Sequence, residues 1–331
     1  MVFKKVMASS LLAAAVMTAS LAHAADVRVG LVVKALGIGF FEAANKGAQE
    51  AAKELGDVEV IYTGPTSTTA EGQIEVINSL IAQKVDAIAV SANDTDALVP
   101  ILKKAQKRGI KVISWDSGVG KAGRQIHLNP SSNPLIGEMN IKLADVAAKA
   151  AGGGKADIAI LSATPTSTNQ NIWIDEMKKV LPNYANLNLV ATVYGDDLAD
   201  KSYRETIGLL KSHPNLKVIV APTSVGIVAA AQAVKDQGKI GKVFVTGLGL
   251  PSELAGHVKS GAVKSFAIWN PIDLGYAATM ISYNLVKGKA TASEVSMGRI
   301  GTAKLDADGN AAMAEPFIYD ASNVDEFAEI F

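Results

Sequence analysis

The chain has 331 residues, of which 49% are hydrophobic and 19% are charged, a length and composition that predict roughly two domains with substantial cores. Basic and acidic residues are equal in number, at 32 each, so we expect no nucleic-acid partner. Cysteine is absent, which excludes disulfides and cysteine nucleophiles. The hydrophobic cores alone must therefore stabilise the fold.

Residues 1–24 are predicted to be a secretory signal peptide. Lys4 and Lys5 precede an apolar run over residues 6–22, and Ala22-His23-Ala24 is a small-x-small cleavage signal. The run is too short for a membrane span. Cleavage after Ala24 removes two lysines and no acidic residue, so from 32 of each sign it leaves 30 basic and 32 acidic residues, a net charge of −2. We therefore expect an exported bacterial protein located in the periplasm.

Strands alternate with helices along the first half of the remaining chain. The first predicted strand, residues 27–33, is followed by a loop that contains Lys34, Phe40 and Phe41, and then by a helix over residues 42–55. Further strands are predicted at residues 58–62, 87–90 and 111–115, and further helices at residues 70–83 and 94–108. This alternation predicts an α/β fold with a parallel sheet covered on both faces.

A second series of strands and helices follows a polar segment. Asn129-Pro130 interrupts the alternation and Asn270-Pro271 ends a later strand, so we interpret Asn129, Pro130, Asn270 and Pro271 as hinge residues at crossings between domains. Strands are predicted between them at residues 157–162, 189–194, 218–221, 243–247 and 263–269. The result is two similar α/β halves joined by several segments, which we assign to residues 25–129 with 270–291 and residues 130–269 with 292–331.

The last segment of the chain gives weaker signals. We interpret residues 296–331 as a hairpin followed by a short helix that Asn323 caps. Asp306 to Asn310 resembles half of a calcium-binding loop, but its glycine comes two positions early, so a hairpin turn is the better interpretation.

Residues suited to catalysis or metal binding do not cluster. Three histidines follow the predicted signal peptide, namely His127, His213 and His257. None has a triad-like or metal-like spacing, so we expect no catalytic residue and no metal site. Gly37-Ile38-Gly39 lacks the third glycine of a dinucleotide-binding fingerprint, and Gly152-Gly153-Gly154 precedes a strand and is predicted to end a helix. We therefore expect no cofactor.

Aromatic side chains concentrate at predicted strand ends and crossings. Aromatic residues make up only 5% of the chain, yet all three tryptophans lie at such places, namely Trp115, Trp173 and Trp269. Ordinary core packing is the alternative for each tryptophan taken alone. Together with Phe40 and Phe41 they favour a shared cleft, because an aromatic face packs against the C–H face of a sugar ring while neighbouring polar groups such as Asn270 bind its hydroxyls.

Two charged residues directly follow apolar strands of the first half. Lys34 and Asp116 stand at the edge where open α/β sheets bind ligands, although a solvated position is the alternative for either one alone. Charge-assisted hydrogen bonds from such groups to neutral hydroxyls contribute about 1.5–3 kcal/mol each. An ionic substrate would need an arginine fork, and Arg124 and Arg204 are poorly placed for one.

Several motifs resemble those of the periplasmic sugar-binding proteins of ABC importers, class I or ribose-binding-like. The resemblance covers essentially the whole chain after residue 24 and is carried by Gly39-Phe40-Phe41 and residues 73–83, 86–91 and 111–117. Within this family the chain is most similar to rhizobial-type rhamnose-binding proteins, through residues 62–73, 167–175, 245–252 and 266–275. The resemblance implies two doubly wound domains, a three-segment hinge and a ligand between the domains.

A sister branch, the autoinducer-2 receptors, helps to define the expected specificity. This sequence keeps several contact positions of that branch, namely Lys34, Asp116, Gln170 and Pro222. It departs at Asn169, where those receptors carry Asp, and at Ser224, where they carry Ala. An amide in place of a carboxylate removes a charge and adds a donor, so a different hydroxyl pattern should be recognised. Ribose-type binders carry an acid where this chain has Gly249, which argues against ribose.

We therefore expect a monomeric substrate-binding protein, not an enzyme, that closes two domains around L-rhamnose or a related deoxyhexose. Its expected partners are a small neutral sugar or polyol and the membrane permease of an ABC transporter. The expected ligand-binding residues are Lys34, Phe40, Phe41, Trp115, Asp116, Asn169, Gln170, Trp173, Pro222, Thr223, Gly249, Trp269 and Asn270. The alternatives are a receptor for autoinducer-2, a pentose or a branched sugar, in transport or signalling, and less favourably a sugar isomerase or epimerase.

Overall fold

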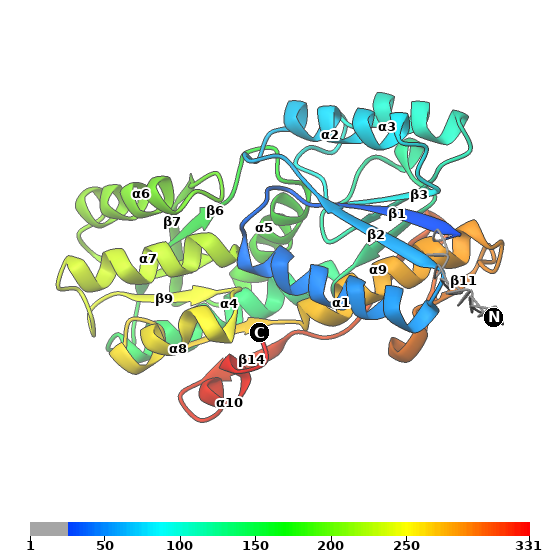
Figure 1. The fold of residues 1–331 in the computed structure, drawn as a ribbon. Coiled ribbons are helices and arrows are strands. Elements are labelled where there is room, and N and C mark those ends of the chain that lie inside the picture. The colour runs from blue at the N-terminus through cyan, green and yellow to red at the C-terminus, as the bar shows by residue number, and fades with distance from the viewer. Residues whose placement is uncertain (1–25) are drawn as a thin grey trace, which may run out of the picture.

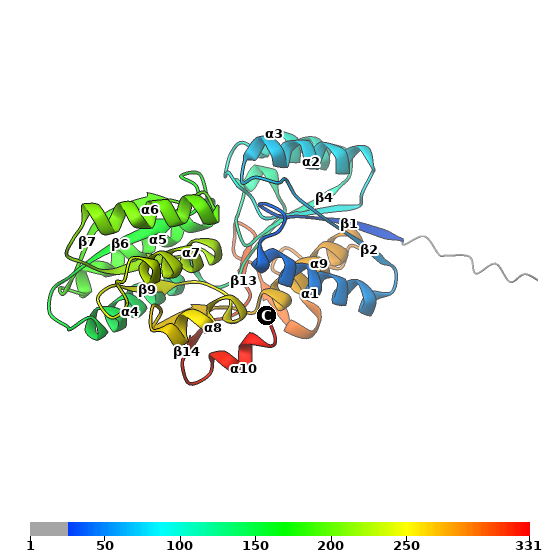
Figure 2. The same cartoon turned by 60° about the vertical axis from the view of Figure 1, so that its left-hand side comes forward.

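The computed structural model describes residues 26–331, so the predicted signal peptide and its cleavage site lie outside the described residues. The chain forms two lobes, each a parallel sheet with helices on both faces (Figures 1 and 2). This confirms the predicted α/β fold with two doubly wound sheets. None of the helices in residues 26–331 is long and apolar enough to cross a membrane.

The first lobe contains a six-stranded parallel sheet in the order β13-β5-β4-β3-β1-β2. Its strands are β1 (Val27–Val32), β2 (Val58–Thr63), β3 (Ala87–Val90), β4 (Lys111–Trp115), β5 (Ile126–Asn129) and β13 (Asn310–Ala312). Its helices are α1 (Gly39–Leu55), α2 (Ala70–Ala82), α3 (Val99–Lys107) and α9 (Pro271–Val286). Successive side chains of β1 explain why both faces are covered: Leu31 belongs to the same core as α1, and Val32 to the core beneath α2 and α3.

The second lobe contains a four-stranded parallel sheet in the order β7-β6-β8-β9. Its strands are β6 (Ala156–Ser162), β7 (Leu187–Tyr194), β8 (Leu216–Ala221) and β9 (Phe244–Gly247). Two isolated bridges extend it toward β10 (Ser265–Ile268), which pairs antiparallel with β14 (Phe317–Asp320). The helices are α4 (Asn133–Ala150), α5 (Thr168–Val180), α6 (Ala199–Ser212), α7 (Ser224–Asp236), α8 (Pro251–Ser260) and α10 (Val324–Ala328).

The chain crosses between the two sheets three times. Asn129-Pro130 lies at the first crossing, between β5 and α4, and Asn270-Pro271 lies at the second, between β10 and α9. The third crossing joins β13 to β14 over residues 313–316. Its backbone runs beside the first crossing, because the Met313 N–H donates to the Asn129 carbonyl at 2.9 Å and the Ala314 N–H to the Pro130 carbonyl at 3.0 Å. Two of the three segments thus form one hydrogen-bonded ribbon.

The structure corrects the predicted assignment of residues 292–331 to the second domain. Strands β11 (Glu294–Ser296) and β12 (Thr302–Lys304) form a hairpin against α9, and β13 pairs with β5 in the first sheet. Only β14 and α10 belong to the second lobe. The segment around β5, interpreted from the sequence as a pause, is itself a strand. Strands β5 and β13 have four and three residues and lack the continuous apolar run that made residues 87–90 recognisable from sequence.

For the last segment, the predicted hairpin turn was wrong and the predicted helix cap is right in position only. Asp306 to Asn310 does not close a hairpin, because it connects β12 to β13, and these strands pair with different partners. The Asp306 carboxylate instead accepts hydrogen bonds from the Asp308 and Asn310 N–H groups, both at 2.8 Å. Asn323 occupies the N-cap position of α10 as predicted, but its side chain makes no capping hydrogen bond, since its side-chain oxygen accepts from the Asp320 N–H at 3.0 Å.

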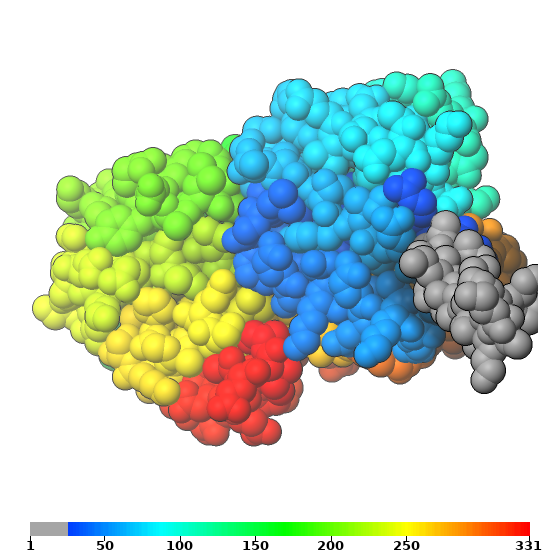
Figure 3. Space-filling view, in the orientation of Figure 1, coloured from blue at the N-terminus to red at the C-terminus, as the bar shows by residue number. Residues whose placement is uncertain are grey.

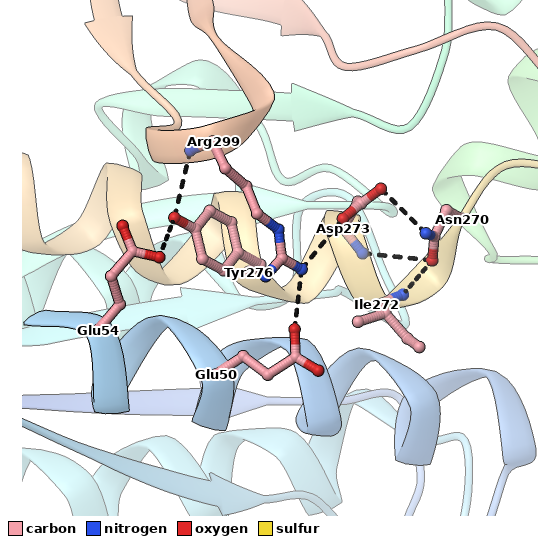
Figure 4. Close-up of polar contacts among 7 residues, drawn as sticks. All are labelled: Glu50, Glu54, Asn270, Ile272, Asp273, Tyr276 and Arg299. Atoms are coloured by element: carbon pink, nitrogen blue, oxygen red, sulfur yellow. Dashed lines mark hydrogen bonds and ion pairs between the residues drawn. The ribbon is translucent and has the colours of Figure 1, made fainter. Parts of the chain in front are cut away.

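Arg299 anchors the β11–β12 hairpin to the helices beneath it (Figure 4). Its guanidinium lies 4.1 Å from the centre of the Tyr276 ring and donates to Glu50 at 2.8 Å and to Asp273 at 3.2 Å. Tyr276 in turn donates its hydroxyl to Glu54 at 2.8 Å. Because Asp273 also accepts from Asn270 at 2.9 Å, the hairpin is connected through hydrogen bonds to the second crossing.

Helices α1 and α9 pack closely because each presents a glycine to the backbone of the other. A Cβ added at Gly275 would lie 1.9 Å from the Ala44 carbonyl oxygen, and one added at Gly47 would lie 1.7 Å from the Ile272 carbonyl oxygen. We predict that Gly275→Ala lowers the free energy of unfolding by about 3 kcal/mol, because backbone cannot move aside as a side chain can. Thermal and urea unfolding measure this loss.

The matched control is Gly208→Ala in α6, where an added Cβ would meet no atom within 4 Å. This substitution should raise the free energy of unfolding by up to about 1 kcal/mol, since alanine has the higher helix propensity. Equal effects of the two substitutions would contradict the proposed steric origin.

His127 on β5 is buried as a neutral imidazole. Its ring nitrogens lie 2.9 Å from the Ser114 hydroxyl and 3.0 Å from the Asn129 side-chain oxygen. Burial, aided by the charge of Arg124, lowers the pKa of His127 to about 4. Between pH 6.5 and about 4, His127 is therefore protonated in the unfolded chain but neutral in the folded chain. The contribution of His127 to stability is full above that window and is lost as the pH falls through it.

The unfolding free energy of the wild type should decrease between pH 7 and pH 4. We predict that this decrease is about 3 kcal/mol smaller in His127→Gln. Urea unfolding at several pH values measures this difference. His213→Gln, at the end of α6, provides the control. A wild type and a His127→Gln variant with parallel pH profiles would show that His127 does not titrate in this way.

Candidate ligand-binding site between the lobes

Polar side chains from both lobes meet where the carboxyl ends of the parallel strands face one another. From the first lobe, Lys34 follows β1 and Asp116 follows β4. From the second lobe, Asn169 and Gln170 lie in the first turn of α5, and Thr223 is the N-cap of α7. In open α/β sheets this edge is where ligands bind, so the topology alone brings these groups together.

The Lys34 ammonium joins the two lobes. The side chain is only 3% exposed, and its Nζ donates to the Ser167 hydroxyl at 2.9 Å and to the Asn169 side-chain oxygen at 2.8 Å. Both acceptors belong to the loop and first turn of α5, in the other lobe. Burial of an ammonium is costly unless it is hydrogen-bonded, and here its hydrogen-bond acceptors come from the other lobe. These contacts can form only when the two lobes are close together.

Asp116 supplies a buried carboxylate opposite the second lobe. Its φ of +57° is unusual for a residue other than glycine and is best tolerated by Asp or Asn. One carboxylate oxygen accepts from the Ser91 hydroxyl at 2.7 Å, and the other accepts from the Asn169 amide at 3.0 Å. Burial raises the pKa of Asp116, while the charge of Lys34 and both hydrogen bonds oppose the rise.

The lobes are in contact along more than this central cluster. The Thr68 hydroxyl donates to the Asp196 carbonyl at 2.7 Å, and the hydroxyls of Thr95 and Thr168 lie 2.9 Å apart. In the space-filling view the first lobe, in blue and cyan, lies directly against the second lobe, in green and yellow (Figure 3). The structure therefore represents the closed form of a two-lobe protein.

Four aromatic rings form an edge-to-face series across the junction. The Phe40 ring lies 5.3 Å from Phe41 in the first lobe and 6.3 Å from Trp269, which lies 5.6 Å from Trp173. The Trp173 indole N–H donates to Asn133 at 3.0 Å, whereas the Trp269 indole nitrogen is buried without a partner in the described chain. Edge-to-face packing fixes these rings as a stable apolar wall.

One cavity between the lobes gathers most of the predicted residues. It contains about 410 Å³ of space not occupied by protein, its opening included. The predicted residues that line it are Lys34, Phe40, Phe41, Asp116, Asn169, Gln170, Trp173, Pro222, Thr223 and Trp269. These side chains come from five separate segments of the chain, which shows how completely the fold determines the site.

Three predicted residues do not line this cavity. Trp115 is fully buried behind Phe41, with ring centres 5.8 Å apart, because it points to the α1 face of its sheet. Gly249 adjoins the core of the second lobe, where an added Cβ would lie 2.6 Å from Leu254. Asn270 instead caps α9, accepting from the Ile272 N–H at 2.9 Å. Strand-end position alone does not settle the direction of a side chain.

The structure adds residues that sequence reasoning missed. The cavity is also lined by Ile38, Asp197, Leu248 and Ile268, and by Ser224, which the sequence comparison named only as a departure from the autoinducer-2 receptors. Asp197 lies three residues after the end of β7, whereas Asp116 directly follows β4, so the search for charged residues directly after strands did not identify Asp197. Burial raises the pKa of Asp197, while Lys34 and the hydrogen bond from Thr223 oppose the rise.

The cavity offers many hydrogen-bonding groups and one apolar wall, but few groups suited to catalysis. Its charged groups are one ammonium and two carboxylates. Among residues 26–331 no three His, Cys, Asp or Glu side chains are arranged to hold a metal ion. The arrangement is suited to enclosing a small polar molecule.

Comparisons with known proteins agree with this architecture. Residues 29–290 match the family model described as a periplasmic binding protein domain. A solved ABC transporter solute-binding protein from Clostridium phytofermentas, with bound L-rhamnose, is 38% identical, with a TM-score of 0.86 and coverage of 92% of this chain and 99% of that one. LsrB from Clostridium saccharobutylicum in complex with AI-2 shares the fold, with a TM-score of 0.86, 24% identity and coverage of 91% and 99%.

A curated relative, the D-ribose/D-allose-binding protein of Pseudomonas aeruginosa, is 28% identical over 280 residues, which is 80% of this chain and 86% of the relative. The family match, the lengths covered and the two-lobe architecture all agree. This chain belongs to the periplasmic binding protein family.

Proposed function

We propose that this protein is the substrate-binding component of an ABC sugar importer and that it binds L-rhamnose or a closely related deoxyhexose between its lobes. The observation that carries the proposal is the closed cavity, which combines buried polar groups from both lobes with an aromatic wall. The periplasm is the expected location, and an ABC permease is the expected partner. Binding and release, rather than covalent chemistry, are the expected activity.

The charges of the cavity favour a neutral ligand. Lys34 is the one cation among the lining residues, and it faces two carboxylates, Asp116 and Asp197. No arginine lines the cavity to form the bidentate contacts that carboxylates and phosphates prefer. Hydroxyl groups both donate and accept, so a sugar can satisfy the carboxylates, the ammonium and the Gln170 amide together.

The apolar side chains that line the cavity favour a sugar that carries a methyl group in place of a hydroxymethyl group. Ile38, Leu248 and Ile268 line the cavity beside the aromatic rings. A 6-deoxyhexose presents a methyl group and a C–H ring face. Burial of these apolar surfaces favours binding by about 25 cal/mol per Å² of surface removed from water. The solved relative at 38% identity contains L-rhamnose, a 6-deoxyhexose, which supports the same choice here.

Hinge motion is the proposed route for ligand entry. Most of the lining side chains are buried between the lobes, so we expect a sugar to enter when the lobes separate, and the three crossings are the segments that would bend. Asn129, Pro130, Asn270 and Pro271 are the hinge residues proposed from sequence, and residues 313–316 join them. The bound sugar then stabilises the closed form, which a permease can distinguish from the open one.

A thermal-shift and calorimetry panel tests the specificity. We predict that L-rhamnose gives the largest increase in melting temperature, with smaller increases for L-fucose and L-mannose and little effect from D-ribose or AI-2. Such an increase follows from binding to the folded state alone. A large shift with D-ribose and none with L-rhamnose would overturn the specificity, and no response to any neutral sugar would overturn sugar binding.

Asp116→Asn is the matched variant for this panel. Asn keeps the backbone conformation at φ +57° and removes the charge, so the unliganded melting temperature should be unchanged or raised. The affinity for L-rhamnose should fall by at least tenfold, because a charge-assisted hydrogen bond of about 1.5–3 kcal/mol is lost. A melting temperature that drops without ligand would instead indicate a structural role for Asp116.

Asn169→Asp tests the difference from the autoinducer-2 branch. The Asn169 amide donates to Asp116 at 3.0 Å, so a carboxylate there would face another carboxylate. We predict that the variant binds L-rhamnose more weakly and that its Kd rises between pH 5 and pH 8, because a shared proton is lost as pH rises. Calorimetry at several pH values measures the trend. The control is Asn171→Asp, whose amide donates to the Pro165 carbonyl at 2.8 Å in the same turn of α5 but does not line the cavity.

A further inference from the structure

We propose that Asp197 is a specificity-determining residue, whose carboxylate accepts a hydrogen bond from one hydroxyl of the bound sugar. This inference rests on the proposed function and assigns a role to a residue that neither the sequence motifs nor the resemblance to autoinducer-2 receptors indicated. The argument comes from its position, its partners and the charge balance of the cavity.

Asp197 is held in a fixed position at the edge of the second lobe. It follows β7, lines the cavity and has a φ of +53°, so the backbone there favours Asp, Asn or Gly. One of its carboxylate oxygens accepts the Thr223 hydroxyl. Thr223 is itself fixed, because its hydroxyl oxygen caps α7 by accepting the Gly226 N–H at 3.3 Å. The chain therefore orients the Asp197 carboxylate before any ligand arrives.

The second carboxylate oxygen of Asp197 is the group available to a ligand. Among the described residues only Thr223 forms a hydrogen bond with this carboxylate, through Oδ1. Asp116, in contrast, accepts from Ser91 and Asn169 with both oxygens. An ionised carboxylate in a closed cavity needs more than one donor. A sugar hydroxyl is the donor that fits a cavity of this size and composition.

The charge balance supports the same conclusion. Lys34 lies close enough to both Asp116 and Asp197 to lower the pKa of each carboxyl, and Asp197 raises the pKa of Asp116. The single ammonium already donates to Ser167 and Asn169. One ammonium cannot neutralise two carboxylates, so hydroxyl groups of the ligand would have to donate hydrogen bonds to the remaining negative charge. We place one such donor at Asp197, on the opposite lobe from Asp116.

The test combines substitutions in the protein with deletions in the ligand. Asp197→Asn keeps the backbone conformation and can still accept from Thr223, so the protein should fold and melt like the wild type without ligand. The Kd for L-rhamnose should rise ten- to a hundredfold, measured by calorimetry. Asp200→Asn, on the exposed first turn of α6, is the matched control and should leave the Kd unchanged.

The 2-, 3- and 4-deoxy derivatives of L-rhamnose identify the hydroxyl. For one of them the wild type should lose affinity by a similar factor, and Asp197→Asn should lose nothing further, because the two changes remove the same hydrogen bond. The other two derivatives should show additive losses. Additive losses for all three derivatives, or an unchanged Kd for Asp197→Asn, would overturn the assignment of Asp197.

The two proposals fail in different ways. If the wild type binds another neutral sugar more tightly than L-rhamnose, the same comparison of wild type and Asp197→Asn is made with the deoxy derivatives of that sugar. The result of that comparison then tests the role of Asp197. If the wild type binds a sugar that Asp197→Asn binds equally well, the inference on Asp197 is wrong and the proposed function stands. If the wild type binds no neutral sugar, both are wrong.

Discussion

The closed structure depends on one buried ammonium that is shared between two lobes. Lys34 belongs to the first lobe, yet its two hydrogen-bond acceptors, Ser167 and Asn169, belong to the second. Two carboxylates, one from each lobe, lie within electrostatic reach of it. Separation of the lobes would return the ammonium and the carboxylates to water, where each is well solvated. The free-energy difference between open and closed forms is therefore small compared with the energies of the individual contacts, which is the condition under which a neutral ligand can shift the equilibrium.

The sequence predicted the regular part of this arrangement. Long, strongly periodic segments such as the helix around residues 42–55 and the apolar strand before Lys34 define the two doubly wound sheets. Strand-end position then brings Lys34 and Asp116 to one cavity, because the carboxyl ends of parallel strands share an edge. Gln170, in the first turn of α5, was expected from the resemblance to autoinducer-2 receptors. These are consequences of local pattern and topology, and both can be read from the chain.

The rest depends on pairings that the sequence does not display. Strand β13 pairs with β5, about 180 residues earlier in the chain, and neither is long enough to show alternation. Trp115 and Asn270 stand at strand ends like the lining residues, but one side chain turns toward α1 and the other caps α9. Asp197 was overlooked because two adjacent aspartates after a strand look like an ordinary solvated turn. Side-chain direction at a strand end is decided by tertiary packing.

The aromatic wall and the polar cluster should respond differently to the proposed opening of the lobes. Trp269 directly precedes Asn270 at the second crossing, and a residue close to one of the proposed hinges would move least if the lobes rotated about it. Its contact with Phe40 can therefore persist while Lys34 separates from Ser167 and Asn169. Arg299 supports this division, because it holds the start of α9 through Asp273, one turn beyond the same crossing. A sugar would thus meet a nearly preformed apolar surface first, and its hydroxyls would then supply the hydrogen bonds that draw the second lobe closed. On this account the aromatic wall contributes affinity to both forms, and the polar groups that meet only on closure contribute selectivity.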